Sequence, residues 1–492
     1  MKLCFKTLSV FLMLLVLAVP AALAQPAKCP VPLPNPPPVT ISSQLPQDVC
    51  LPANVTSGAP FFDDFSWRSF VALVWPSKAG QRGVPDPNGV PGGSGTPVFQ
   101  TYKADWEVFQ PNGAKPTEWS TYEVGANPCP DAPTGAFVLA AFSKYGNLGQ
   151  AAQGSFVGPL VSQNVQYTRF LAAFNQVEFD EIRDLNWYLQ SGLTQNITFT
   201  PDALQNNPID IKSAWMVMTQ GWDTSRFYTT TAYVLNPSDG SCTQQTVGLV
   251  GLHIVTKTPS RPQWIWSTFE QVDLIPQPGA KKPYSYNDDS GTPMPGANPI
   301  PFPPSPEPCK PTPAYPCPFN VTRTQNINPL TITTNGNYQQ ALAGQGSGVW
   351  QYYKLAMTQW PNDSSTTYSL ANTTPGSNTN PMTAFSNLTM ETFDQAKVRN
   401  GCMACHNATG ATSGATTDFN WAVALNAFPS PLGTNASQPQ FHQLMATPQS
   451  AGAKRLIALL AQNRKDMAES QKAAKPPAKK DDQPKPKPKQ PK

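Results

Sequence analysis

Val247-Gly-Leu-Val-Gly-Leu-His-Ile-Val255 is apolar along nearly its whole length, and this run decides the fold. Such a segment predicts a strand that is buried on both faces. Trp264-Ile-Trp-Ser-Thr-Phe269 follows it, and two further runs with strand character, 209–218 and 227–234, precede it. Consecutive strands joined by short turns without intervening helices predict an antiparallel sheet.

Shorter patterns surround this sheet. Trp67, Phe70, Val71 and Val74 recur with helical spacing, and Asp63 with Asp64 stand where a helix cap is expected. Further helices are predicted at 170–189, 390–398 and 451–472, short strands at 102–108 and 136–142, an ordered segment at 349–357, and a strand or short helix at 418–425.

The composition agrees with a β-containing chain rather than a helical bundle, because it has 56 Pro, 32 Gly and only 13% charged residues. We expect an α+β fold: a mainly antiparallel β domain with peripheral helices and long Pro-rich loops, plus a small, mostly α-helical C-terminal segment. The expected organisation is a signal peptide at 1–24, a Pro-rich extension at 25–60, a β-rich domain at 61–375 with a Pro-rich insertion at 275–318, a cofactor-binding segment at 376–470 and a Lys/Pro tail at 471–492.

Cys402-Met-Ala-Cys-His406 has the C-x-x-C-H spacing of covalent c-type haem attachment. Cys402 and Cys405 can form thioethers with the two vinyl groups of one porphyrin, and His406 then falls on the proximal side of the iron. A redox C-x-x-C would need a βαβ setting, and a zinc site would need a second ligand pair at short spacing. Neither accompanies this motif, so the sequence predicts one covalently bound haem c.

The N-terminus indicates export. Lys2 and Lys6 precede an apolar run, Leu8–Val19, and Ala22-Leu-Ala24 resembles a cleavage site. Haem c is attached after export, so we expect a periplasmic or secreted bacterial protein. No later stretch approaches 18 consecutive apolar residues, so no transmembrane segment is expected.

Six cysteines remain after the signal peptide and the haem pair are set aside, and an even number in an exported chain predicts disulfides. Cys309–Cys317 would close a short loop, and Cys29–Cys50 is a weaker pairing. Cys129 and Cys242 would then pair by elimination.

The charge of +4 is unevenly distributed. The tail at 471–492 contributes +6 and Lys2 with Lys6 contribute +2, so the rest of the chain carries −4. Nothing here suggests nucleic acid as a partner. The basic tail could contact an anionic surface, although a solvated tail is the default interpretation.

The sixth ligand of the iron stays open. His253, His442 and Met445 are the candidates, and an open sixth position is the alternative. Each candidate also has an ordinary structural explanation: His253 as a core histidine, His442 as a surface histidine and Met445 as a packing methionine. Glu270 and Asp273 invite a catalytic hypothesis, although carboxylates facing solvent at a strand end are commoner. Arg261 could pair with a haem propionate.

Three stretches accompany the cysteine motif: Gly251–Pro259, Trp264–Asp273 and Asn387–Phe393. With these companions the chain resembles a group of large exported bacterial proteins termed "cytochrome c family" proteins, over roughly residues 60–75, 205–275 and 380–425. The resemblance implies haem bound through Cys402, Cys405 and His406, and it implies no particular reaction. We therefore expect electron transfer to a redox partner protein; the alternatives are a haem oxidoreductase acting on a small molecule and a haem-containing binding or sensor protein.

Overall fold

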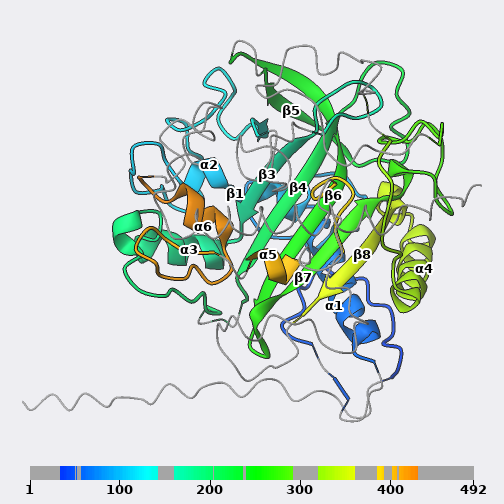
Figure 1. Cartoon of the computed structure of the whole chain (residues 1–492), viewed down its shortest axis with the longest axis horizontal. Helices are drawn as coiled ribbons and strands as arrows, with labels where there is room; N and C mark the ends of the chain where they lie inside the picture. The colour runs from blue at the N-terminus through cyan, green and yellow to red at the C-terminus, as the bar shows by residue number, and fades with distance from the viewer. Residues whose placement is uncertain are drawn as a thin grey trace, which may run out of the picture.

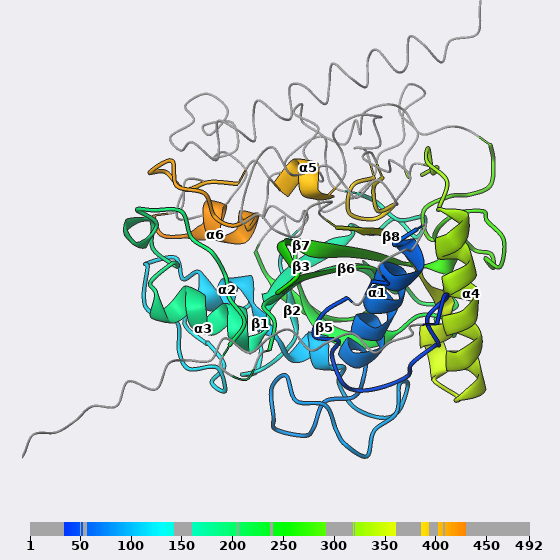
Figure 2. The ribbon, with the colours of Figure 1, turned by 90° about the horizontal axis from the view of Figure 1, so that it is seen from below.

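The computed structural model describes residues 34–49, 51–52, 57–141, 160–202, 204, 206–236, 240–291, 318, 320–360, 385–392, 402–406 and 409–429. This part of the chain is an α+β structure built on one curled sheet in which antiparallel pairs predominate (Figures 1 and 2). The predicted α+β class and antiparallel sheet are confirmed.

The described residues form a sheet of eight strands. Their bounds are β1 Lys103–Ala104, β2 Val138–Leu139, β3 Arg169–Phe174, β4 Ile209–Val217, β5 Thr229–Leu235, β6 Cys242–Thr258, β7 Arg261–Gln271 and β8 Tyr353–Gln359. The order is β1-β3-β4-β6-β5-β2, while β7 pairs with both β6 and β8. Only the pairing of β2 with β5 is parallel.

Strand β6 is the centre of the sheet. One of its edges pairs with β4 from Val247 to Thr256. The other edge pairs with β5 as far as Gly248 and with β7 from Gly251 onward, so the sheet divides into two wings between these glycines. Every residue of β6 from Val247 to Thr258 is buried, as the apolar run predicts.

Helices cover both faces of the sheet. Their bounds are α1 Ala59–Leu73, α2 Asp105–Val108, α3 Gln176–Asp184, α4 Pro329–Gly344, α5 Cys402–His406 and α6 Trp421–Asn426, with 3₁₀ turns at Val98–Thr101, Gln190–Gly192, Val272–Leu274 and Gly348–Tyr352. In Figure 2, α1 and α4 lie on one side of the sheet and α5 on the other.

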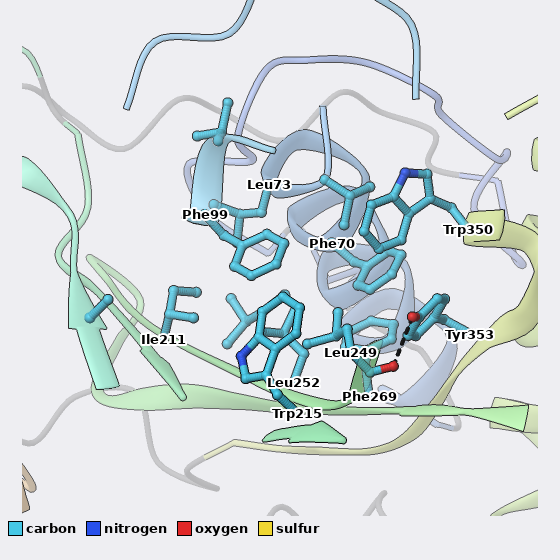
Figure 3. Close-up of a cluster of buried hydrophobic side chains, with 14 of the residues drawn as sticks. Phe70, Leu73, Phe99, Ile211, Trp215, Leu249, Leu252, Phe269, Trp350 and Tyr353 are labelled. Atoms are coloured by element: carbon cyan, nitrogen blue, oxygen red, sulfur yellow. Dashed lines mark hydrogen bonds between the residues drawn. The ribbon is translucent and has the colours of Figure 1, made fainter. Parts of the chain in front are cut away.

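The largest core lies between α1 and the sheet (Figure 3). Leu252 and Phe269 face Phe70 of α1, and the Phe70 and Phe269 rings stack with centroids 4.4 Å apart. The hydroxyl of Tyr353 donates to the carbonyl of Leu249 at 2.9 Å, which satisfies a polar group inside this apolar layer. Burial of these aromatic side chains is the main stabilisation of the sheet face that α1 covers.

The helix predicted from Trp67 and Phe70 is present, but Asp63 and Asp64 do not cap it, which corrects the prediction. The helix begins earlier, at Ala59, with Pro60 in its first turn. Asp63 instead accepts hydrogen bonds from Thr331 of α4 and Thr358 of β8, at 2.7 and 2.8 Å. Burial raises the pKa of Asp63 to about 6.

The helix predicted at 170–189 is wrong in its first part. Residues 169–174 form β3, and α3 begins only after Asn175, whose side chain caps the helix by accepting from the backbone N–H of Glu178 at 3.1 Å. A short apolar run does not distinguish strand from helix by periodicity alone. Likewise, most of the strand predicted at 102–108 is the helical turn α2.

The other local predictions have mixed outcomes. Residues 418–425, left open between strand and helix, contain the start of α6. Residues 390–392 form a turn rather than the start of a helix. The pairing of Cys129 with Cys242 is confirmed, with Cα atoms 5.6 Å apart. The pairings Cys309–Cys317 and Cys29–Cys50 and the helix at 451–472 lie outside the described residues.

Residues 385–392 are fastened across the sheet by polar contacts to β6 and β7. The side-chain amide of Asn387 donates to the carbonyl of Phe269 at 3.0 Å. The backbone N–H of Leu388 donates to the carboxylate of Glu270 at 2.8 Å. A Cβ at Gly251 would lie 2.2 Å from the hydroxyl oxygen of Thr389, so this close approach requires a glycine in β6.

We predict that Gly251→Ala destabilises the protein by about 1–3 kcal/mol, because the added methyl group must displace the segment 385–392. Gly336→Ala is the matched control, since a Cβ at this position of α4 meets no atom within 4 Å. The control should be stabilising by roughly 0.5–1 kcal/mol, as expected for alanine in a helix. Urea unfolding of the three proteins measures both effects. Equal stability of Gly251→Ala and the wild type would contradict the packing described.

Candidate functional site

The motif Cys402–His406 forms the short helix α5 on the face of the sheet opposite α1. The side chain of Met403 is fully buried in a cluster that contains Val255 of β6 and Trp266 of β7. The backbone N–H of Met403 donates to the side-chain oxygen of Gln359 at 3.2 Å. Cys402 is half-buried beside the same cluster. These contacts with the sheet therefore fix the position of α5.

The imidazole of His406 is held on two sides. Its Nδ1 lies 2.7 Å from the backbone carbonyl oxygen of Phe419, and its ring centroid lies 4.4 Å from that of Trp266. A carbonyl oxygen can only accept, so Nδ1 carries the proton and the lone pair of the neutral ring is on Nε2. This is the arrangement by which proteins orient a metal-ligating histidine through its second nitrogen.

The Phe419 carbonyl is positioned by an unusual turn. Asp418 and Phe419 both have positive φ, 49° and 66°, a conformation that costs free energy for residues other than glycine. The Asp418 carboxylate offsets this cost by accepting from Lys257 Nζ at 2.5 Å and from the N–H of Phe199 at 2.8 Å. The Asp418 carbonyl accepts from the indole N–H of Trp264 at 3.0 Å. The turn is thus held from the sheet and from the loop after α3.

Burial raises the pKa of Asp418, and the ammonium of Lys257 opposes that shift. Both side chains are nearly inaccessible to solvent, so each would be an uncompensated buried charge without the other.

His253 lies on the same face of β6 as Val255 and Lys257, because alternate residues of a strand share a face. It is 5% exposed, and its Nε2 lies 3.5 Å from a carboxylate oxygen of Glu391. The structure therefore brings His253 together with the segment 385–392, on the sheet face that also carries α5. The other two candidates for the sixth ligand, His442 and Met445, lie outside the described residues.

The carboxylates Glu270 and Asp273 are buried, so the expectation that they face solvent is wrong. Glu270 pairs with Arg323 and lies 3.9 Å from Lys354 Nζ, and it also accepts from the N–H of Leu388. Its contacts fasten the segment 385–392. Asp273 lies 3.2 Å from the guanidinium of Arg226.

Arg261 lies away from α5. Its guanidinium stacks on Phe62 of α1, 5.1 Å from the ring centroid. Nothing in this position favours the earlier hypothesis that it binds a propionate.

A row of buried titratable side chains lies on the sheet face that carries α5, and the sequence analysis did not identify it. Glu178 of α3 accepts from the Asn420 side chain at 2.6 Å, and burial, reinforced by the nearby Asp210, raises the pKa of Glu178 well above its ordinary value. Asp210 lies 3.5 Å from Lys212, whose register partner on β6 is His253. Asp210 and Lys212 alternate with Ile209 and Ile211 along β4. Alternation alone does not tell whether the polar face of a strand is buried or exposed, so the sequence does not reveal this row.

We predict that Lys257→Met destabilises the protein by about 3–5 kcal/mol, because it leaves the Asp418 carboxylate buried without a counter-charge. The double variant Lys257→Met with Asp418→Asn should recover most of that loss, because the asparagine is neutral and tolerates positive φ. Urea unfolding compares the two with the wild type. If the double variant were as unstable as the single one, the ion pair would not be what holds this turn.

The comparisons find no protein-family model, curated protein or solved structure that matches this chain. Within the described ranges, no group of three or more His, Cys, Asp and Glu side chains is placed to hold a metal ion. No helix in those same ranges is long and apolar enough to cross a membrane. The function must therefore be argued from the residues and contacts of this chain.

Proposed function

We propose that this protein is an exported, monohaem c-type cytochrome that transfers electrons to and from a redox partner protein. The observation that carries the proposal is the hydrogen bond between His406 Nδ1 and the Phe419 carbonyl within a C-x-x-C-H helix. It sets the tautomer that an iron ligand needs, in a residue whose sequence position already indicates haem attachment.

The residues of the chain have distinct roles in this proposal. Cys402 and Cys405 would hold the haem by thioethers, and His406 would ligate the iron. Bound haem supplies one-electron exchange between ferric and ferrous iron. The Phe419 carbonyl keeps the proton on Nδ1, and the Trp266 ring packs against the imidazole and limits its rotation.

The remaining parts of the proposal concern location and organisation. The segment 376–470 would be the haem-binding part of the chain and mostly helical, and α5 and α6 are its described helices. The N-terminal 24 residues would direct export to the periplasm or the medium. The Lys/Pro tail at 471–492 would remain solvated or contact an anionic surface.

A second function, oxidation or peroxidation of a small molecule at the haem, is favoured by one observation. The buried row formed by Glu178, Asp210, Lys212 and His253 lies on the sheet face that carries α5. Burial raises the pKa of Glu178 and of Asp210, and buried carboxyl groups of this kind can donate and accept protons, which an electron carrier does not require. This function needs an open or labile sixth position on the iron.

Absorption spectra of the protein exported from a haem-maturing host test both functions. We expect a covalent haem chromophore that is lost in the double variant Cys402→Ala with Cys405→Ala. Cys129→Ala with Cys242→Ala is the matched control, because it removes two bonded cysteines from another part of the structure and should keep the chromophore. A wild-type protein without haem would contradict the proposal.

Carbon monoxide added to the dithionite-reduced protein then separates the two functions. An unchanged spectrum means that the iron has two protein ligands, and it supports the electron carrier. In that case His253→Ala makes the iron accessible to carbon monoxide only if His253 is the sixth ligand. Ready binding of carbon monoxide to the wild type would overturn the carrier in favour of the oxidoreductase.

A further inference from the structure

The turn before α6 connects His406 to a buried carboxyl group on α3. The Phe419 carbonyl lies 2.7 Å from His406 Nδ1, and the next residue, Asn420, donates through its side-chain amide to Glu178 at 2.6 Å. The peptide unit between Phe419 and Asn420 is also held from its other side, because the N–H of Asn420 donates to the carbonyl of Thr417 at 2.8 Å. Two hydrogen bonds and the residues Phe419 and Asn420 therefore link Glu178 to the imidazole.

The side chain of Asn420 is engaged at both of its ends. Its oxygen caps α6 by accepting from the backbone N–H of Val423 at 2.8 Å, while its nitrogen donates to Glu178. Asn420 and Glu178 are 3% and 0% exposed, so water does not compete for these contacts. Glu178 thereby fixes the residue that follows the Phe419 carbonyl, and a carboxyl oxygen can accept this hydrogen bond in either protonation state.

The surroundings of Glu178 disfavour its ionised form. Its second oxygen, Oε2, is buried and has no hydrogen-bond partner among the described residues. An ionised carboxylate would therefore have a hydrogen bond at only one of its two oxygens. The charged groups that face Glu178 within the described ranges are three acidic residues and one basic residue: Asp210 and Lys212 of β4, Glu181 of α3 and Asp418 of the turn.

The basic groups nearby are shared with other carboxylates. Lys212 Nζ lies 3.5 Å from Asp210, and Lys257 Nζ lies 2.5 Å from Asp418. Burial, reinforced by Asp210, raises the pKa of Glu178 well above its ordinary value. Glu178 is thus a carboxyl group that a further positive charge in its neighbourhood would help to ionise.

An iron bound to His406 would supply such a charge. Charges interact strongly where protein excludes water, so Glu178 would ionise more readily beside ferric iron than beside ferrous iron, which carries one positive charge less. The linkage is reciprocal: ionisation of Glu178 would lower the reduction potential of the iron.

We propose that Glu178 positions the iron ligand His406 through Asn420, and that its carboxylate takes up one proton when the iron is reduced. The electron comes from the redox partner or substrate and the proton from solvent, and the proton forms an O–H bond on Glu178. Reoxidation returns the proton to solvent. The inference rests on the proposed haem and applies to both proposed functions, because each changes the oxidation state of the iron.

Midpoint reduction potentials of the exported haem protein, measured across the pH range in which it stays folded, test the proposal. The wild-type potential should fall with rising pH, by at most about 59 mV per pH unit, which corresponds to one proton per electron. Glu178→Gln should remove most of this dependence and keep the low-pH potential, because the glutamine oxygen still accepts from Asn420 but the side chain does not ionise. A wild-type potential independent of pH, or an equally strong dependence in Glu178→Gln, would overturn the proposal.

Two further variants serve as controls. Asp63→Asn is matched to Glu178→Gln, since Asp63 is also a buried carboxyl group with a raised pKa, about 6, but lies on α1 across the sheet. It should keep the wild-type dependence on pH, and its loss there would overturn the assignment to Glu178. Glu178→Ala should shift the potential even at low pH, because it releases Asn420. Equal potentials of Glu178→Ala and Glu178→Gln at every pH would overturn the positioning role.

Two spectroscopic measurements separate this inference from the proposed function. Infrared difference spectra should show the C=O stretch of a protonated carboxyl group appearing on reduction of the wild type and absent in Glu178→Gln. A covalent haem chromophore without that band would overturn the inference alone. A protein without haem would overturn the proposed function and the inference together.

Discussion

Strand β6 pairs with β4 along one edge and with β5 and then β7 along the other, and it is buried on both faces from Val247 to Thr256. The rest of the described structure depends on this constraint. One face carries the apolar core under α1. On the other face, three alternate residues each contact a different C-terminal segment. His253 meets Glu391, Val255 packs in the cluster of Met403, and Lys257 binds Asp418. A register shift of one residue would exchange the two faces and remove all three contacts.

The charged residues on this second face add little net stability, because desolvation offsets most of the attraction within a buried ion pair. An apolar residue at position 418 would moreover have to adopt a positive φ without the carboxylate contacts that offset the cost of that conformation. What an apolar pair could not do is hold the turn at Asp418 and Phe419 in its positive-φ conformation with the Phe419 carbonyl against His406. We interpret the pair as a device that fixes the orientation of the imidazole.

The sequence predicts the strands at 209–273 well, because β-branched and aromatic residues fill them and polar turns separate them. It fails at 170–174, where a short apolar run fits both strand and helix until Asn175 ends it. In the site, the motif Cys402–His406 can be recognised from the sequence, and so can the chemical role of each of its residues. The partners of His406 cannot be predicted in this way, because the Phe419 carbonyl is placed by a contact between Lys257 and Asp418, 161 residues apart. Backbone carbonyls also leave no signature in the sequence.

The central claim is covalent attachment of one haem at Cys402 and Cys405. Intact-mass spectrometry of the exported protein, followed by sequencing of the peptide that contains residues 402–406, tests it most directly. We predict a mass larger than that of the mature chain by one haem, located on this peptide. An exported chain with the mass of the polypeptide alone, made in a host that matures other c-type cytochromes, would contradict the account.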